Sequence, residues 1–133
     1  MRPPPLLAAL LFGVSALSAT TAPAQTAPRP ENACFDITRH GGVVALDDKT
    51  LLLRSGPSTY RITVAGACPG LSHPDPRITL VARAGPLVCG RLDYDLLVGE
   101  AGVPNPGLPC MVDTQHRLTA TELADLPPSR RPH

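Results

Sequence analysis

The sequence has very few aromatic residues. Of its 133 residues, none is Trp, two are Tyr and two are Phe. Proteins that bind single-stranded nucleic acid stack bases on aromatic side chains that lie beside basic groups. This chain has too few rings for such a platform, and the same scarcity argues against a sugar-binding surface built from Trp or Tyr. We therefore expect no nucleic-acid partner.

The sequence also lacks an excess of charge of either sign. Its formal net charge is +1, and Lys49 is its single lysine. A large field of one sign is what captures nucleic acid or an anionic membrane over long distances. The charge balance therefore favours neither kind of partner.

The common motifs of catalysis and cofactor binding are missing as well. The sequence has no G-x-S-x-G elbow for a nucleophilic serine, no G-x-G-x-x-G turn and no phosphate-binding P-loop. Its four cysteines and four histidines show neither the C-x2-4-C nor the H-x3-5-H spacing of a closed zinc site. We therefore expect no metal and no cofactor.

The first 24 residues have the pattern of a secretory signal peptide. Arg2 supplies a positive start, the apolar run of residues 6–17 follows, and Ala22-Pro23-Ala24 forms a small-x-small cleavage site before Gln25. The apolar run is shorter than the ~20 residues that span a bilayer. The pattern predicts a signal peptide over residues 1–24, a periplasmic or secreted protein, and no stable membrane insertion after cleavage.

The segment that follows this leader differs from the rest of the chain. Residues 25–33 (QTAPRPENA) are rich in proline and show no apolar periodicity. Such a composition is typical of an extended linker. We expect residues 25–33 to be a flexible tether and the folded domain to begin at Cys34.

Residues 34–127 show the pattern of a β-rich domain. Tyr60, Ile62 and Val64 alternate with polar residues, which is the pattern of a half-buried strand. Residues 78–83 and 93–98 alternate in the same way, and Gly- and Pro-containing turns separate the apolar segments. The fold class predicted is mainly β (α+β), a small antiparallel sheet, sandwich or partly open barrel of about 6–8 short strands.

One short helix is predicted near the C-terminus. Thr119 and Glu122 have the spacing of a capping box, in which each side chain bonds the backbone N–H of the other residue. Pro127 and Pro128 end the helix because proline cannot continue it. Residues 128–133 are predicted to be a disordered tail.

The four cysteines, Cys34, Cys68, Cys89 and Cys110, are predicted to form two disulfides in an oxidising compartment. Four cysteines allow three pairings, and the sequence alone cannot choose between them. We favour the nested pairing, Cys34–Cys110 with Cys68–Cys89, since the outer two cysteines open strands at the ends of the core. The sequential pairing, Cys34–Cys68 with Cys89–Cys110, is the rival.

Seven short stretches between Cys34 and Glu122 form an ordered pattern. They are Cys34-Phe35-Asp36-Ile37, Leu46-Asp47-Asp48-Lys49-Thr50-Leu51, Tyr60-Arg61-Ile62-Thr63-Val64, Cys68-Pro69-Gly70-Leu71, Val88-Cys89-Gly90, Cys110-Met111-Val112 and Leu118-Thr119-Ala120-Thr121-Glu122. Together they resemble a family of small exported bacterial proteins that is known as a domain of unknown function. Members often carry a Trp between the first strand and the Asp-Asp turn, where this chain has Gly41-Gly42-Val43. The resemblance implies export and a shared fold, and it implies no activity.

Three residues are candidates for chemistry: Asp93, Asp95 and His116. If residues 93–98 form a strand, Asp93 and Asp95 share one of its faces, where two carboxylates can bind a cation or act as an acid–base pair. The structural alternative is a solvated face or ion pairs with nearby arginines. His116 lies in a predicted strand close to the helix start, where it is either a proton carrier or a surface residue.

Two functions follow from these observations. The first is a non-enzymatic, exported binding or envelope-associated module whose partner is an envelope or periplasmic protein. Its contact surfaces are then the loops over residues 71–77 and 99–109, because loops on a rigid scaffold usually carry function. The second is a small hydrolase or metal-assisted enzyme that uses Asp93, Asp95 and a histidine. The missing catalytic motifs favour the first.

Overall fold

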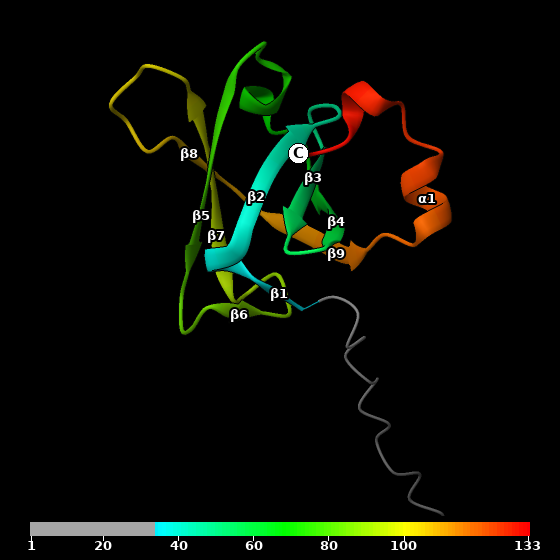
Figure 1. Ribbon diagram of the computed structural model, residues 1–133. Coiled ribbons are helices and arrows are strands. Elements are labelled where there is room, and N and C mark those ends of the chain that lie inside the picture. The colour runs from blue at the N-terminus through cyan, green and yellow to red at the C-terminus, as the bar shows by residue number, and fades with distance from the viewer. Residues whose placement is uncertain (1–33) are drawn as a thin grey trace, which may run out of the picture.

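The computed structural model describes residues 34–133, which form two packed antiparallel sheets and a small two-stranded ladder (Figure 1). The predicted signal peptide (1–24) and tether (25–33) lie outside these residues. The prediction of a mainly β fold with one short helix and two disulfides is confirmed. The described residues contain nine strands in three antiparallel sheets, and no closed barrel.

The larger sheet has four strands in the order β2-β3-β4-β9. The first three form a meander, and Gly56, with φ of 57°, makes the tight turn between β3 and β4. Glycine suits this turn because it adopts positive φ without a steric penalty. The strands are β2 (His40–Ala45), β3 (Thr50–Ser55), β4 (Ser58–Val64) and β9 (Val112–Arg117).

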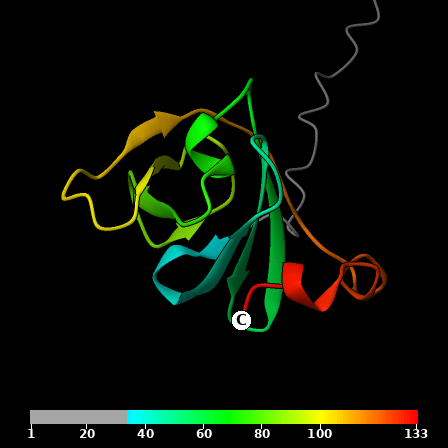
Figure 2. The same ribbon diagram turned by 90° about the horizontal axis from the view of Figure 1, so that it is seen from above.

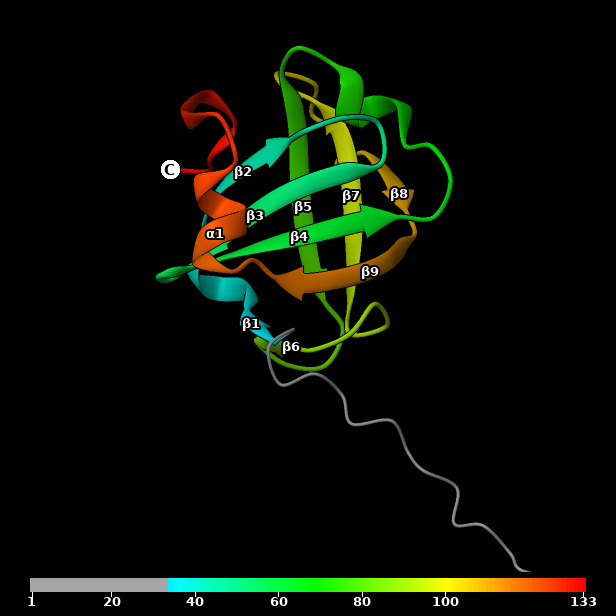
Figure 3. The ribbon, with the colours of Figure 1, turned by 90° about the vertical axis from the view of Figure 1, so that its right-hand side faces the viewer.

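The second sheet has three strands in the order β5-β7-β8, and its strands cross those of the larger sheet steeply (Figure 3). The third sheet is the ladder of β1 and β6 at one end of the molecule. Four short helices complete the described chain. The remaining elements are β1 (Phe35–Asp36), η2 (Ile37–Arg39), η3 (Pro69–Ser72), β5 (Pro76–Ala82), β6 (Leu87–Val88), β7 (Tyr94–Glu100), β8 (Leu108–Cys110), α1 (Ala120–Ala124) and η4 (Pro128–Arg130).

The chain passes from the second sheet to the larger one at a single residue. Cys110 ends β8 opposite Leu96 of β7, and Val112 begins β9 opposite Val64 of β4. Met111 lies between them, and it is 74% exposed. Strands that switch sheets in this way form the corners of crossed β-structures. We call Pro109–Val112 the β8–β9 corner.

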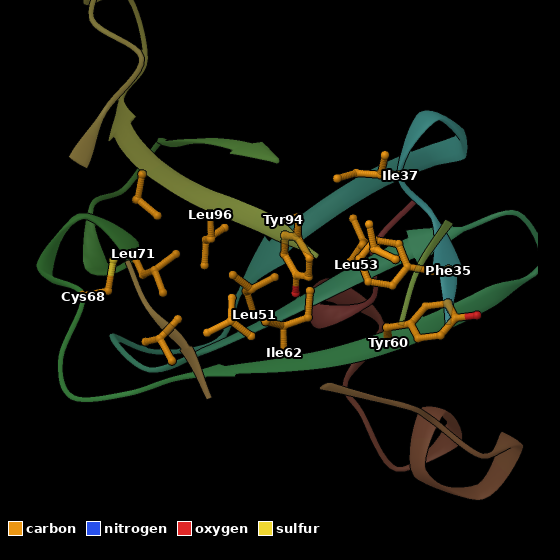
Figure 4. Packing of buried hydrophobic residues seen from close by; sticks show 14 residues of the cluster. Phe35, Ile37, Leu51, Leu53, Tyr60, Ile62, Cys68, Leu71, Tyr94 and Leu96 are labelled. Carbon is orange, nitrogen blue, oxygen red and sulfur yellow. The ribbon is translucent and has the colours of Figure 1, made fainter. Parts of the chain in front are cut away.

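The core lies between the two large sheets (Figure 4). The alternating residues of β4 and β7 point into it, as their pattern predicts. Phe35 joins the sheets, since its ring centroid lies 5.2 Å from that of Tyr60 and 5.7 Å from that of Tyr94. Largely buried members of this core are Phe35, Leu51, Leu53, Tyr60, Ile62, Val64, Leu71, Val88, Tyr94, Leu96, Val98 and Val112.

The disulfides join Cys34 to Cys89 and Cys68 to Cys110, so the nested pairing predicted from the sequence is wrong, and so is its sequential rival. The reason lies in the strand pairing. The β1–β6 ladder pairs Phe35 with Val88, and this register brings the preceding Cys34 opposite the following Cys89. An antiparallel two-residue ladder thus decides the first bridge.

The second bridge follows from the β8–β9 corner. Val64 pairs with Val112, and the amide of Ala65 donates to the carbonyl of Met111 at 2.8 Å. The chain after β4 therefore runs past the corner, where Cys68 reaches Cys110. Cys68–Cys110 consequently links the loop after β4 to the end of β8.

The tail over residues 128–133 is folded, which differs from the predicted disorder. Pro128–Arg130 form η4, and the Arg130 guanidinium donates to the carbonyl of Leu46 at 2.7 Å. The amide of Gly42 in β2 donates to the carbonyl of His133 at 2.8 Å. The basic, proline-containing sequence gives no sign of this contact. The tail covers the outer edge of β2 (Figure 1).

Gly42 is required for this contact because a Cβ atom at this position would lie 2.5 Å from the carbonyl oxygen of His133. Gly42→Ala is therefore expected to displace the end of the tail and lower the free energy of unfolding by about 1 kcal/mol, the value of one hydrogen bond. Hydrogen exchange should show a less protected Gly42-position amide. Gly85→Ala is the control, since nothing lies within 4 Å of its added Cβ. Equal protection in both variants would contradict the prediction.

Candidate functional site

Asp93 holds a loop together. It precedes β7, and its Oδ2 atom accepts hydrogen bonds from the amides of Cys89 and Gly90 at 2.8 and 2.9 Å. These bonds close the turn between β6 and β7. Asp93 and Asp95 therefore have different partners, and the structure does not make them one carboxylate pair.

Asp95 is engaged by an arginine on the outer face of the second sheet. The Arg83 guanidinium binds both of its oxygens, with Nε 3.2 Å from Oδ2 and a second, shorter contact from Arg83 Nη2 to Oδ1. Hydrogen bonds from Arg83, followed by its charge, lower the pKa of Asp95. This carboxylate is therefore an ionised partner of Arg83 at neutral pH, and its low pKa makes it a poor general base.

His116 lies on β9, where its Nε2 is 3.8 Å from Oε1 of Glu122. Glu122 belongs to the predicted capping box, which is confirmed: its carboxylate accepts from the amide of Thr119, and its own amide donates to the Thr119 hydroxyl. Hydrogen bonds that the carboxylate accepts from the backbone amide and the hydroxyl of Thr119 lower the pKa of Glu122. His116 thus belongs to the helix start, and no contact in the described chain joins it to Asp93 or Asp95.

The loop role of Asp93 gives a testable prediction. Asp93→Ala removes the acceptor of two backbone amides, and the half-buried turn should lose about 1–3 kcal/mol of stability. Urea denaturation measures this loss. Asp95→Ala is the matched control, since its exposed ion pair with Arg83 contributes less than about 1 kcal/mol. A larger loss for Asp95→Ala than for Asp93→Ala would contradict the assignment.

The two loops predicted as contact surfaces lie next to each other. The amide of Ala101 donates to the carbonyl of Asp75 at 3.4 Å, and Arg77 Nη1 donates to the carbonyl of Val103 at 3.3 Å. In Figure 2 the loop between β7 and β8 projects away from α1, at the opposite side of the molecule. These loops flank the β8–β9 corner, which shares only Pro109 with the contact surface predicted from the sequence.

A cavity of about 410 Å³ lies on one side of the corner, and we call it the edge cleft. Its volume is in the range of sites for small ligands. Its walls are mainly apolar, with two arginines and one carboxylate at the rim. The edge cleft is lined by Arg83, Arg91, Leu92, Tyr94, Asp95, Leu96, Pro109, Cys110, Met111 and Val112.

Two ion pairs flank the edge cleft. One is Arg83 with Asp95, and the other joins Arg91 to Asp113 of β9 at 4.0 Å. Both pairs are largely exposed, so solvent screens them and each contributes little to stability. They therefore place positively charged donors and negatively charged acceptors at the rim of the cleft, and they do not hold the rim rigidly.

Tyr94 is a buried wall residue of the edge cleft, with 1% of its surface exposed. Its hydroxyl has no hydrogen-bond partner among residues 34–133. Burial raises the pKa of Tyr94, so the group is neutral at ordinary pH and cannot serve as an anionic nucleophile. A buried hydroxyl without a partner carries a desolvation cost.

A second cavity of about 400 Å³ lies on the other side of the corner. It shares Pro109, Cys110 and Met111 with the edge cleft. Leu92, Leu108 and Met111 are each at least 70% exposed around the two cavities. Exposed apolar patches mark surfaces for interaction with proteins or membranes, or grooves that bind ligands.

The sequence contains one sign of this surface. Leu92 stands in the polar turn Gly90–Asp93, where a large apolar residue has no packing reason to lie. Met111 gave no such sign, because it falls within an apparently continuous strand. Its exposure results from the change of sheet at the corner.

Comparisons with known proteins locate the chain in one family. A model described as a family of unknown function matches residues 3–133. The chain belongs to the DUF6491 family. No curated protein and no solved structure matches it. The family resemblance expected from the cysteine pattern is therefore confirmed as membership in DUF6491, which carries no assigned activity.

Two further observations concern this DUF6491 domain. Within residues 34–133, no three His, Cys, Asp or Glu side chains cluster as a metal site would require. No helix in the same part of the chain is long and apolar enough to cross a bilayer. The candidate site that the structure offers is the apolar β8–β9 corner, because two cavities and the exposed Met111 lie there.

Proposed function

We propose that this DUF6491 protein is an exported, non-enzymatic binding module that contacts an envelope or periplasmic protein through the β8–β9 corner. The observation that carries the proposal is the pair of apolar cavities on either side of Met111. Fixed by Cys68–Cys110, the corner presents exposed apolar side chains on a rigid frame. Rigid, pre-organised surfaces lose little entropy when a partner binds.

The chemistry of the candidate residues supports a binding role over catalysis. Asp93 accepts from two backbone amides, Asp95 binds Arg83, and His116 faces Glu122. A hydrolytic site needs a nucleophile or activated water, a base and a stabilising donor directed at one point. The three side chains lie in separate contacts, so they support the binding module better than the alternative hydrolase.

Two features support export. Both pairs of cysteines are joined as disulfides, and disulfides persist in oxidising compartments. The leader pattern of residues 1–24 predicts the route. Intact-mass analysis of the protein from the extracytoplasmic fraction is expected to give a chain that begins at Gln25. A chain that begins at Met1 in that fraction would contradict the predicted cleavage.

Site-specific photocrosslinking in the native host tests the binding role. A photoreactive amino acid at Leu108, which is 74% exposed beside the second cavity, is expected to form one dominant adduct with an envelope or periplasmic protein. The matched control is Leu87, which is 64% exposed on β6 and lines neither cavity. Met111→Glu should abolish the Leu108 adduct. Equal adducts from both positions, or none from Leu108, would refute the corner as the binding surface.

A further inference from the structure

The most exposed large apolar side chains of residues 34–133 gather at the β8–β9 corner. Leu92, Leu108 and Met111 are 70%, 74% and 74% exposed, and each lines at least one of the two cavities beside the corner. Leu87, which is 64% exposed, lies on β6 and lines neither cavity. Burial of apolar surface is favourable by about 25 cal/mol per Å². A second surface placed on the corner therefore gains more than one placed on β6.

An exposed side chain and a cavity lie side by side at the corner. Met111 connects the two large sheets, and it also forms part of the wall of the edge cleft, whose volume is about 410 Å³. A methionine side chain has three rotatable bonds and adapts to irregular cavities. In a two-fold symmetric pair, the same patch of each subunit meets the other. An exposed Met111 next to a cavity thus allows each subunit to fill the cleft of the other.

The charges around the edge cleft are also complementary to themselves. Two arginines and two aspartates flank it, in the pairs Arg83–Asp95 and Arg91–Asp113, so this group has a formal charge of zero. Their side chains are 43–59% exposed. A two-fold rotation reverses the order of the charges along the surface, so an arginine of one subunit can face an aspartate of the other. A strongly acidic or strongly basic partner would instead meet like charges at half of these positions.

We propose that two copies of the protein pair through the β8–β9 corner, and that each copy thereby covers the binding surface of the other until a partner protein competes for it. The inference rests on the proposed binding function, because the covered surface is the one assigned to the partner. Met111 of each subunit enters the edge cleft of the other, with arginines and aspartates facing each other around it. The formal net charge of +1 leaves little repulsion between copies.

The pairing is weak and reversible. Permanent dimers bury more than about 2,000 Å² in their interfaces, whereas weak and transient contacts bury less than about 1,200 Å². The corner belongs to the second class, because each chain has its own core between its sheets and contributes only three highly exposed apolar side chains. A weak pair separates when a partner binds, which a permanent dimer would prevent.

Sedimentation velocity of the purified exported chain tests the pairing. Between about 1 µM and about 1 mM protein, the mean mass is expected to rise from one chain toward two. Met111→Glu should weaken the association about tenfold or more, because it places a charge in an apolar contact. Leu87→Glu is the matched control at an exposed position outside both cavities, and it should change the dissociation constant less than about twofold.

Charge reversal distinguishes a second copy from any other occupant. Arg91→Glu and Asp113→Arg each give the rim an excess of one sign, so each variant alone should pair about threefold to tenfold more weakly than the parent protein. An equimolar mixture of the two variants should pair more strongly than either, since each supplies the charge that the other lacks. Both side chains are exposed and their ion pair contributes little to stability, so both variants should fold like the parent protein.

Photocrosslinking of the purified protein tests the competition. A photoreactive amino acid at Leu108, beside the second cavity, is expected to give an adduct of two copies of the chain. Addition of an extracytoplasmic extract of the native host should reduce this self-adduct as an adduct with another protein appears. An equal mass of serum albumin should leave the self-adduct unchanged.

Four results would overturn the inference. A parent protein that sediments as one chain at about 1 mM would exclude the pairing. Equal association of Met111→Glu and the parent protein would place the interface elsewhere. A mixture of Arg91→Glu and Asp113→Arg that pairs no better than either variant would exclude the two-fold arrangement. A self-adduct that stays constant while the other adduct forms would exclude competition. The adduct formed in the host is measured separately, so the binding function and the pairing can fail independently.

Discussion

Replacing Cys68 and Cys110 with alanine is expected to lower the free energy of unfolding by about 4 kcal/mol. The bridge closes a loop with a sequence separation of 42, and its loss returns that entropy to the unfolded chain. It also removes the covalent link between the loop after β4 and β8. Domains of about 100 residues are marginal on burial alone, so this change threatens the fold at ordinary temperature.

Chemical denaturation of the oxidised protein measures the effect. Cys34→Ala with Cys89→Ala, where the separation is 55, should give a loss of similar size. The two variants should differ in where they loosen: hydrogen exchange should rise at the β8–β9 corner in the first and at the β1–β6 ladder in the second. Non-reducing peptide mapping of the parent protein checks the pairing, and a Cys34–Cys110 peptide would contradict it.

Phe35→Ala is expected to lower the free energy of unfolding by about 3–5 kcal/mol. Phe35 is 2% exposed and packs against Tyr60 and Tyr94, one from each large sheet. Its removal leaves a cavity between the sheets. The backbone next to it is also tied to this cluster, because the Tyr60 hydroxyl donates to the carbonyl of Cys34 at 2.9 Å.

The thermal midpoint and the urea midpoint of unfolding both measure this change. Phe35→Leu should cost less, since a smaller cavity remains. Leu87→Ala, at a 64% exposed position of β6, should stay within about 0.5 kcal/mol of the parent protein. A loss for Phe35→Ala no larger than that of Leu87→Ala would show that the aromatic cluster does not hold the sheets together.

Much of this fold was predictable because strands with one buried face show their period directly. The alternation of Tyr60, Ile62 and Val64 predicted strand β4 and its buried face, and Thr119 with Glu122 predicted the start of α1. The disulfide pairing was not predictable, since it depends on a two-residue ladder too short to have a pattern. The packed tail was missed for a related reason: its contacts with β2 are made by backbone atoms, which every sequence has.

The candidate site was harder to predict than the fold. Carboxylates and histidines are candidates for catalysis or metal binding in any sequence. In the structure, however, Asp93, Asp95 and His116 each contact a residue of the fold. The β8–β9 corner depends on a change of sheet within one stretch of chain, and nothing in Cys110-Met111-Val112 marks that change. A sequence shows which residues are apolar, whereas the path of the chain decides which of them remain exposed.

The interleaved order of the bridges has a consequence for how the protein survives proteases. Cys34–Cys89 and Cys68–Cys110 overlap along the chain, so two cuts in different intervals between consecutive cysteines still leave all fragments covalently joined. With the nested pairing, one cut on each side of the inner bridge would release the segment between them. The exposed loop between β7 and β8 lies between Cys89 and Cys110, so it can be cleaved without dividing the molecule. A second cut between Cys34 and Cys89 still frees no fragment until a disulfide is reduced.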